Sequence, residues 1–114
     1  MNVDNIKSQM RKGMLEYCTM LLLQRGDAYP ADIISSLKQA NLIVVEGTLY
    51  PLLTRLKNDG LLTYRWEESR SGPPRKYYSL TDAGHQMLQY LNQAWQDLAD
   101  SIKQLSTNPQ DLQQ

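Results

Sequence analysis

Hydroxyl-bearing and cationic side chains alternate with leucines along the segment EGTLYPLLTRLKNDGLL, which spans residues 46–62. The leucines recur at the spacing of one helical face, which predicts a helix over 46–59 that buries Leu49, Leu52, Leu53 and Leu56. The other faces carry small, polar and cationic residues, namely Gly47, Thr48, Tyr50, Pro51, Thr54 and Arg55. Threonine and tyrosine hydroxyls hydrogen-bond phosphate oxygens and base edges, and arginine neutralises phosphate. The segment therefore predicts a helix whose free face suits contact with double-stranded DNA.

Pro51 lies well inside this predicted helix. Its ring cannot donate the hydrogen bond that would reach the carbonyl of Gly47, so that carbonyl stays free and the first turns are stiffened. Gly47 has no side chain and lets another backbone approach closely. The helix is expected to end at Asn58–Asp59–Gly60, with Gly60 as a left-handed cap. We expect the proline to set the angle at which the free face is presented.

A second cationic group lies in residues 61–80, where the hydrophobic period changes to two. Aromatic and polar residues alternate on both sides of ESRSGPP (68–74), which predicts a β-hairpin with a long tip. Pro73 and Pro74 cannot donate ladder hydrogen bonds, so we expect them at that tip or at its edge. Arg70, Arg75 and Lys76 form a cationic group that suits a phosphate ridge. The alternative is that these charges form only the solvated side of a two-stranded ribbon.

Residues that could perform catalysis or bind a metal are sparse. His85 is the only histidine, and no acidic motif pairs with it, so we expect it at the surface or at a helix terminus. Glu67 and Glu68 are adjacent on a predicted strand and therefore point to opposite faces. The sequence has neither a Cys/His cluster for zinc nor a glycine loop that cradles phosphate. These observations argue against an enzyme and predict no cofactor and no metal site.

The preceding segments supply the elements that must position the polar helix. Residues 7–25 carry a helical apolar stripe that stops before Gly26, which predicts one continuous helix. Pro30 suits the first turn of a second helix, and the β-branched run LIVV (42–45) predicts a short strand. Three helices followed by a hairpin is the order of a winged helix-turn-helix, whose third helix enters a major groove about 12 Å wide.

Residues 81–106 are the most regular segment of the chain. Thr81 can cap a helix, and the apolar residues that follow are separated alternately by three and four positions. This heptad spacing predicts a seam along which two copies of the chain pack. The expected dimerisation residues are Leu88, Leu91, Trp95, Leu98, Ile102 and Leu105. Residues 107–114 lack periodicity and are expected to form a disordered tail.

Charge is distributed unevenly over the 114 residues, although the formal net charge is zero. Residues 1–80 hold eleven Lys and Arg against eight Asp and Glu, a balance of +3, and residues 81–114 have a balance of −3. The first part can therefore face a polyanion, and the second cannot. No apolar run approaches the roughly 20 residues that a membrane span needs. The single cysteine, Cys18, excludes an internal disulfide, fits a cytoplasmic protein and is expected in the core.

The segments GTLYPLLTRLKNDGLL and SGPPRKYYSLTDAG resemble the PadR (phenolic acid decarboxylase regulator) family of bacterial transcriptional regulators. KGMLEYCTMLLL is similar to the first helix of that family, so the resemblance covers about residues 8–105. It implies a homodimeric repressor with a C-terminal dimerisation helix. By this likeness, Thr48 and Tyr50 contact DNA from the third helix, and Arg75 and Lys76 lie near the wing contacts.

Two positions depart from the family pattern. Tyr29–Pro30 replaces the Tyr-Gly that often starts the second helix, which can alter the preceding turn. Val45–Glu46 stands where Ser or Asn commonly precedes the third helix. The second change removes an N-cap, at a cost of order 1 kcal/mol, and puts an acid near the predicted DNA-binding face.

Trp95 is an unusual residue for a heptad seam, which favours Leu, Ile and Val. One interpretation is a bulky interface anchor. The other is the wall of an apolar cavity that stacks a flat ligand, as a tryptophan of this helix does in the drug-binding branch of the family that the chain resembles. Met14 and Met87 could add adaptable lining. A small aromatic effector is therefore a possible third partner, besides DNA and a second copy of the chain.

These observations predict a mainly α-helical protein with a small β-hairpin. A winged helix-turn-helix DNA-binding domain is expected over residues 1–80, with a dimerisation helix over 81–106. The expected function is sequence-specific transcriptional regulation, in which a homodimer represses from a palindromic operator and a small planar or aromatic effector relieves repression. The alternative is a winged-helix module that binds another protein without binding DNA.

Overall fold

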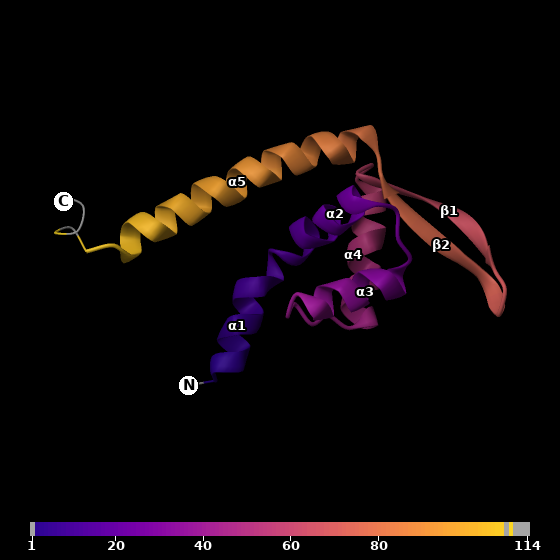
Figure 1. Ribbon diagram of the computed structural model, residues 1–114, viewed down its shortest axis with the longest axis horizontal. Coiled ribbons are helices and arrows are strands. Elements are labelled where there is room, and N and C mark those ends of the chain that lie inside the picture. Colours follow the sequence, from indigo (N-terminus) through magenta and orange to yellow (C-terminus); the bar gives the residue numbers. More distant parts are fainter. Residues whose placement is uncertain (1, 109, 111–114) are drawn as a thin grey trace.

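The computed structural model describes residues 2–108 and 110. The elements follow in the order α1 (Val3–Lys12), α2 (Leu15–Arg25), α3 (Pro30–Gln39), α4 (Glu46–Asn58), β1 (Leu62–Ser69), β2 (Gly72–Leu80) and α5 (Asp82–Ser106). Helices α2, α3 and α4 gather beside the antiparallel β1–β2 hairpin, and α5 runs away from them (Figure 1). The arrangement confirms the predicted winged helix-turn-helix with a long C-terminal helix. Residues 109 and 111–114 of the predicted tail lie outside the described residues.

The leucine face of α4 forms the centre of the core. All four of its predicted leucines are buried, and none is more than 6% exposed. Burying one such side chain stabilises the fold by roughly 2 kcal/mol. They pack with buried residues from the neighbouring elements, which are Met20, Leu23, Ile33, Leu37, Val44, Leu62, Tyr78, Leu80 and Leu88. Gly60 follows the helix with a φ of 79°, so the left-handed end of α4 is as predicted.

The prediction of one helix over 7–25 is wrong, because the chain forms two helices that meet at Gly13–Met14. Asn2 caps α1 by accepting a hydrogen bond from the N–H of Asn5 at 3.1 Å, so this helix starts earlier than predicted. Gly13 has a low helix propensity. Helix α1 also buries none of its residues, so no packing holds the two helices in line. The apolar stripe continues across the break, and periodicity alone therefore did not reveal it.

The short strand predicted at 42–45 is also wrong. The backbone there forms hydrogen bonds with the ends of two helices instead. The N–H of Leu42 donates to the carbonyl of Leu37 in α3. The carbonyl of Val45 accepts from the N–H groups of Thr48 and Leu49 in α4, both at 3.0 Å. Ala28 forms the bridge beside the hairpin, exchanging two backbone hydrogen bonds with Tyr78. The residue that pairs with the β2 edge of the hairpin thus comes from the segment before α3, and the β-branched run pairs with no strand.

The hairpin tip is shorter than the predicted segment 68–74, since Ser69 pairs directly with Gly72. Pro73 and Pro74 lie within β2, where two residues face the single residue Glu68 on β1. This irregularity has the residue count of a β-bulge. Proline is tolerated there because a two-stranded ribbon has edges that require no ladder hydrogen bond. The wing is consequently a long regular ribbon with only Arg70 and Ser71 between its strands.

Thr81 joins the hairpin to α5. Its hydroxyl donates to the carbonyl of Gly60 at 2.6 Å and accepts from the N–H of Gly84 at 3.0 Å, which confirms the predicted N-cap. The N–H of Thr81 donates to the carbonyl of Leu61 at 3.1 Å. Gly84 lies against the same carbonyl, and a Cβ added there would collide with its oxygen. The start of α5 is therefore fixed against the segment that leaves α4.

Helix α5 leaves the core beyond Leu88. Leu91 is half-buried against the core, whereas the later heptad residues Trp95, Leu98, Ile102 and Leu105 are between 43% and 87% exposed. The hydroxyl of Tyr17 on α2 donates to the Asn92 side chain at 2.6 Å, close to where the two helices begin to diverge. Helices α1 and α5 then extend in different directions from the core (Figure 1). A long apolar stripe is thereby left uncovered within one chain.

Candidate nucleic-acid interface

Helix α4 presents its polar residues to solvent because its leucines occupy the core. Residues Gly47, Thr48, Tyr50, Pro51, Thr54 and Arg55 are all exposed. Val45 stands at the N-cap and makes no side-chain cap hydrogen bond, so the first N–H groups of α4 lack a capping side chain. The N–H groups of Glu46 and Gly47 and the threonine and tyrosine hydroxyls are free to donate to phosphate oxygens or base edges.

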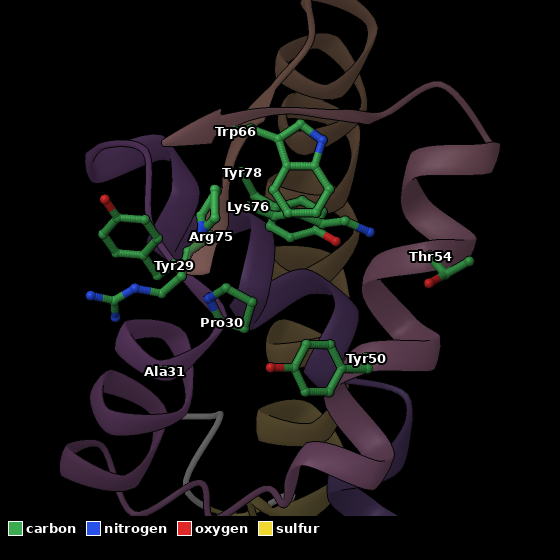
Figure 2. Close-up of a pocket in the computed structure, with 10 residues that line it drawn as sticks. Tyr29, Pro30, Ala31, Tyr50, Thr54, Trp66, Arg75, Lys76 and Tyr78 are labelled. Atoms are coloured by element: carbon green, nitrogen blue, oxygen red, sulfur yellow. The ribbon is translucent and has the colours of Figure 1, made fainter. Parts of the chain in front are cut away.

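A hollow of about 330 Å³ lies between α4, the start of α3 and the wing (Figure 2). We call it the notch. Helix α4 contributes Tyr50 and Thr54, and α3 with the residue before it contributes Pro30 and Tyr29. The hairpin contributes Trp66, Pro74, Arg75, Lys76 and Tyr78. The notch therefore combines two hydroxyls from the predicted recognition helix with two cations from the predicted wing.

Lys76 is held against aromatic rings on the notch side of the hairpin. Its Nζ lies 4.6 Å from the ring centroid of Tyr64 and 5.5 Å from that of Trp66. Trp66 faces Lys76 directly across the ribbon, and the rings of Tyr64 and Trp66 meet edge to face at 5.9 Å. Figure 2 shows the Lys76 side chain beneath Trp66, with its ammonium turned toward the α4 side. Cation–π attraction of this kind orients an ammonium without neutralising its charge.

Arg75 borders the notch at the α3 side, but its guanidinium is directed away from Lys76, because adjacent strand residues point to opposite faces. Its guanidinium lies 4.8 Å from the ring centroid of Tyr29, which in turn packs 4.7 Å from the ring of Tyr77. The hydroxyl of Tyr29 donates to Glu67 at 3.2 Å. Partial desolvation and the nearby Glu67 carboxylate raise the pKa of Tyr29, so this phenol remains a neutral donor. Tyr29 thus orders the wing from the side of α3.

Two other arginines are already paired with carboxylates. Arg65 donates to Asp27 at 2.8 Å and to Glu67 at 3.0 Å, and the hydrogen bond to Asp27 is the main cause of its raised pKa. Arg55 forms a salt bridge with Glu16 of α2. Among the described residues, the salt bridges involve only these two cations. Arg55 is therefore drawn away from the notch.

The structure groups some of the predicted DNA-binding residues and separates others. Tyr50, Thr54, Arg75 and Lys76 line the notch, whereas Thr48 lies near the start of α4, beside α1. Arg70 is exposed at the turn of the hairpin. Neither Tyr29 nor Trp66 was predicted to belong to the interface, because their places depend on the packing of α3 and on the hairpin register. The two-residue spacing of Tyr64 and Trp66 was the one sequence signal that these two side chains lie on the same face of the ribbon.

An apolar groove of about 600 Å³ lies between α5 and the α1–α2 segment. It brings together the predicted ligand-binding residues Trp95 and Met14, with Met10, Tyr17, Cys18 and Leu98 nearby. Met87 does not line this groove, although it is partly exposed on α5. Cys18 is half-buried rather than deep in the core, and this burial raises the pKa of its thiol.

Two further features concern the part of the chain that the structure describes. None of its helices combines the length and apolarity that crossing a membrane requires. It also contains no group of three or more His, Cys, Asp or Glu side chains placed to hold a metal ion. His85 is exposed in the first turn of α5.

Several known proteins are similar to this chain in sequence, in architecture or in both. The transcriptional regulator PadR-like family model matches residues 20–90. A PadR-like transcription factor from Bacteroides fragilis has 62% sequence identity and a TM-score of 0.76, with 90% of this chain and 99% of that chain covered. A PadR family regulator from Eggerthella lenta has 36% identity and a TM-score of 0.79, with 93% and 94% covered. An uncharacterised protein from Lysinibacillus sphaericus is 26% identical over 100 residues, which are 85% of this chain and 92% of that protein.

These similarities agree with the geometry of the exposed helix and wing. The family model spans more than half of the chain, and the Bacteroides fragilis structure matches nearly all of the described elements. Members of this family are DNA-binding regulators of transcription and not enzymes, as the sequence motifs predicted. The chain therefore belongs to the PadR-like family of transcriptional regulators.

Proposed function

We propose that this protein is a homodimeric repressor that binds a palindromic operator through α4 and the wing. The observation that supports this most directly is the notch, which Tyr50 and Thr54 of α4 line together with Lys76 of the hairpin. Hydroxyl donors next to unpaired cations suit a phosphate backbone. In this proposal α4 enters a major groove, and Gly47 and Thr48 approach base edges while the wing contacts the adjacent backbone.

The uncovered stripe on α5 supports the dimer. Leu98 and Ile102 are about half exposed, and Leu105 is almost fully exposed. Helix α1 presents a second stripe, formed by Val3, Ile6 and Met10, and buries nothing within its own chain. Exposed apolar stripes of this kind, here on α1 and α5, are typical of surfaces that bind another protein. A second copy packed along both would cover them and hold two α4 helices about 34 Å apart, the spacing of successive major grooves.

DNA binding can be tested with duplex DNA from upstream of the protein's own gene, because repressors of this family are expected to act on nearby genes. A gel-shift titration should give tight binding that weakens steeply as salt rises, since bound phosphates release counterions. An unrelated duplex of the same length serves as the control for specificity. Equal binding to both duplexes would contradict sequence-specific recognition.

A protein-binding winged helix is the second candidate, and one observation favours it. Glu46 is exposed in the first turn of α4, next to the residues proposed to approach bases. A carboxylate there repels phosphate and would suit a basic protein surface. Complete absence of salt-sensitive binding to any duplex would favour this candidate over the repressor.

We also propose that the groove beside Trp95 admits a small aromatic effector. Its apolar lining and flat indole suit a planar molecule, and it lies between α5 and the α1–α2 segment. A ligand there can change DNA affinity only if it binds one dimer arrangement better than the other. Titrating phenolic acids and planar cations into the Trp66→Phe variant, which keeps Trp95 as its only tryptophan, should quench fluorescence and weaken DNA binding. No response to either compound class would exclude those effectors.

A further inference from the structure

We propose that Tyr64 and Trp66 act as an aromatic clamp that holds the ammonium of Lys76 at the notch, and that the notch seats the sugar–phosphate strand between the major and minor grooves. This inference rests on the proposed DNA-binding function and adds Trp66 to it as a positioning residue. Trp66 touches the cation, and the cation touches the phosphate.

The place of Trp66 in the fold is the first reason. Its side chain is 61% exposed, so the hydrophobic core does not account for a tryptophan at this position. It stands directly across the ribbon from Lys76, and its ring is fixed edge to face against Tyr64. Tyr64 is itself held by the buried Tyr78, whose ring centroid is 5.5 Å away. The clamp is therefore anchored to the core at one end and open to solvent at the other.

The charge around the clamp is the second reason. The ring of Tyr64 lies between two lysines, with Lys57 of α4 at 5.7 Å and Lys76 at 4.6 Å from its centroid. Within the described part of the chain, neither lysine takes part in a salt bridge. Aromatic faces thus keep two positive charges near α4 without cancelling them. That arrangement is suited to a polyanion that arrives from outside.

The geometry of groove binding identifies the occupant. If α4 lies in a major groove and the wing reaches the adjacent minor groove, the backbone strand that separates the two grooves must pass where α4 meets the hairpin. The notch is at this meeting point. Tyr50 and Thr54 supply hydroxyl donors from one side, and Lys76 supplies charge from the other (Figure 2). Trp66 and Pro74, which are exposed and also line the notch, offer apolar surface for the deoxyribose rings.

The clamp strengthens binding by ordering a flexible side chain in advance. A free lysine side chain loses rotamer freedom when it grips a phosphate, which weakens the complex. Rings that already hold Lys76 reduce this loss. We expect Trp66→Leu to weaken DNA binding about fivefold, a size typical of one exposed cation–π contact. Trp66→Phe keeps a ring at this position and should restore most of the affinity.

A double-mutant cycle separates positioning from direct contact. Dissociation constants are measured by fluorescence anisotropy on a labelled duplex from upstream of the gene, for wild type, Trp66→Leu, Lys76→Gln and the double variant. We expect Lys76→Gln to lower the salt slope by about one, and Trp66→Leu to add no further loss once Lys76 is replaced. Tyr90→Leu is the matched control, because Tyr90 is a 64% exposed aromatic residue on α5. Its affinity should equal that of wild type.

Three results would overturn the clamp. Trp66→Leu could bind as tightly as wild type, the two single losses could multiply in the double variant, or Trp66→Phe could fail to restore binding.

If wild type itself binds no duplex, the proposed function fails, and the clamp is then tested in the free protein by NMR. Ring currents should shift the ε-methylene protons of Lys76 upfield in wild type, and Trp66→Leu should reduce this shift to the part that Tyr64 causes. Unshifted protons in wild type would refute the clamp whatever the protein binds.

Discussion

Removing the hydroxyl of Tyr50 tests the proposed DNA interface by changing a single polar group. The residue is about half exposed on α4 and lines the notch, so Tyr50→Phe should leave the fold unchanged. A hydrogen bond to a charged phosphate contributes about 1.5 kcal/mol, and its loss should therefore weaken DNA binding about tenfold. Anisotropy titration measures this, with Tyr90→Phe as the control. Unchanged affinity would place the hydroxyl outside the interface.

Tyr78 makes a prediction about alkaline stability. Its ring is 4% exposed, and desolvation, followed by the neighbouring Tyr64 and Tyr50, raises the pKa of its phenol above the usual value of 10.0. The folded state therefore holds this proton more tightly than the unfolded state. The free energy of unfolding should be unaffected below pH 9 or so, and should fall as pH rises through about 10.

The measurement is urea denaturation of wild type and Tyr78→Phe at about pH 8 and about pH 11, on either side of the ordinary tyrosine pKa. The Phe variant should lose less stability between the two conditions. Tyr90→Phe, which removes an exposed tyrosine from α5, should lose as much as wild type. If Tyr78→Phe declines as steeply as wild type, the phenol at 78 does not cause the loss.

At the scale of elements, the sequence predicted a helix most reliably where the spacing of apolar residues agreed with the residues that end a helix. Helix α4 carried both, since its leucine stripe stops at Gly60. The N-terminal stripe also stops at Gly26, where α2 ends, but it continues through Gly13 and so did not indicate the break between α1 and α2. The run at 42–45 has strand-forming residues, but its backbone hydrogen-bonds to the ends of α3 and α4 instead of to a strand. Propensity is local, whereas pairing depends on the whole fold.

The candidate interface was predictable in part for the same reason. The free face of α4 followed from the leucine spacing, because burying one face exposes the other. The partners of Lys76 did not follow, since they depend on a turn of two residues that places Trp66 across from Lys76. The salt bridge that draws Arg55 toward α2 joins residues far apart in sequence. No spacing rule could have indicated that contact.

The junction of α5 with the hairpin gives a prediction at this scale. Gly84 packs against the carbonyl of Leu61, so Gly84→Ala must displace α5 or the segment after α4. We expect a loss of about 2 kcal/mol in the free energy of unfolding, typical of overpacking. Gly13→Ala is the control, because no heavy atom lies within 4 Å of its added Cβ. Urea denaturation compares the two, and equal stability would show that α5 accommodates the methyl group.

At the scale of the whole molecule, the proposed dimer determines the affinity for operator DNA. Leu98→Asp places a charge on the uncovered stripe of α5 and should yield a monomer of 13.1 kDa in sedimentation equilibrium. Because two linked binding sites gain through effective concentration, operator affinity should fall by a factor of about 100 or more. Gln104→Asp makes the same charge change on the opposite face of α5 and should remain dimeric. A dimeric Leu98→Asp variant would contradict the proposed seam.

Thr81 connects the C-terminal end of α4 to the start of α5. One hydroxyl binds both the carbonyl of Gly60, just after α4, and the N–H of Gly84, at the root of α5. Along the chain, only a turn and the β1–β2 hairpin separate α4 from α5. The end of α4 and the start of α5 are both hydrogen-bonded to Thr81. In the proposed dimer, we therefore expect a tilt of α5 at its far end to be passed through Thr81 to α4. Such a tilt would change the distance between the two α4 helices, and binding would then require that this distance still match the helical repeat of DNA.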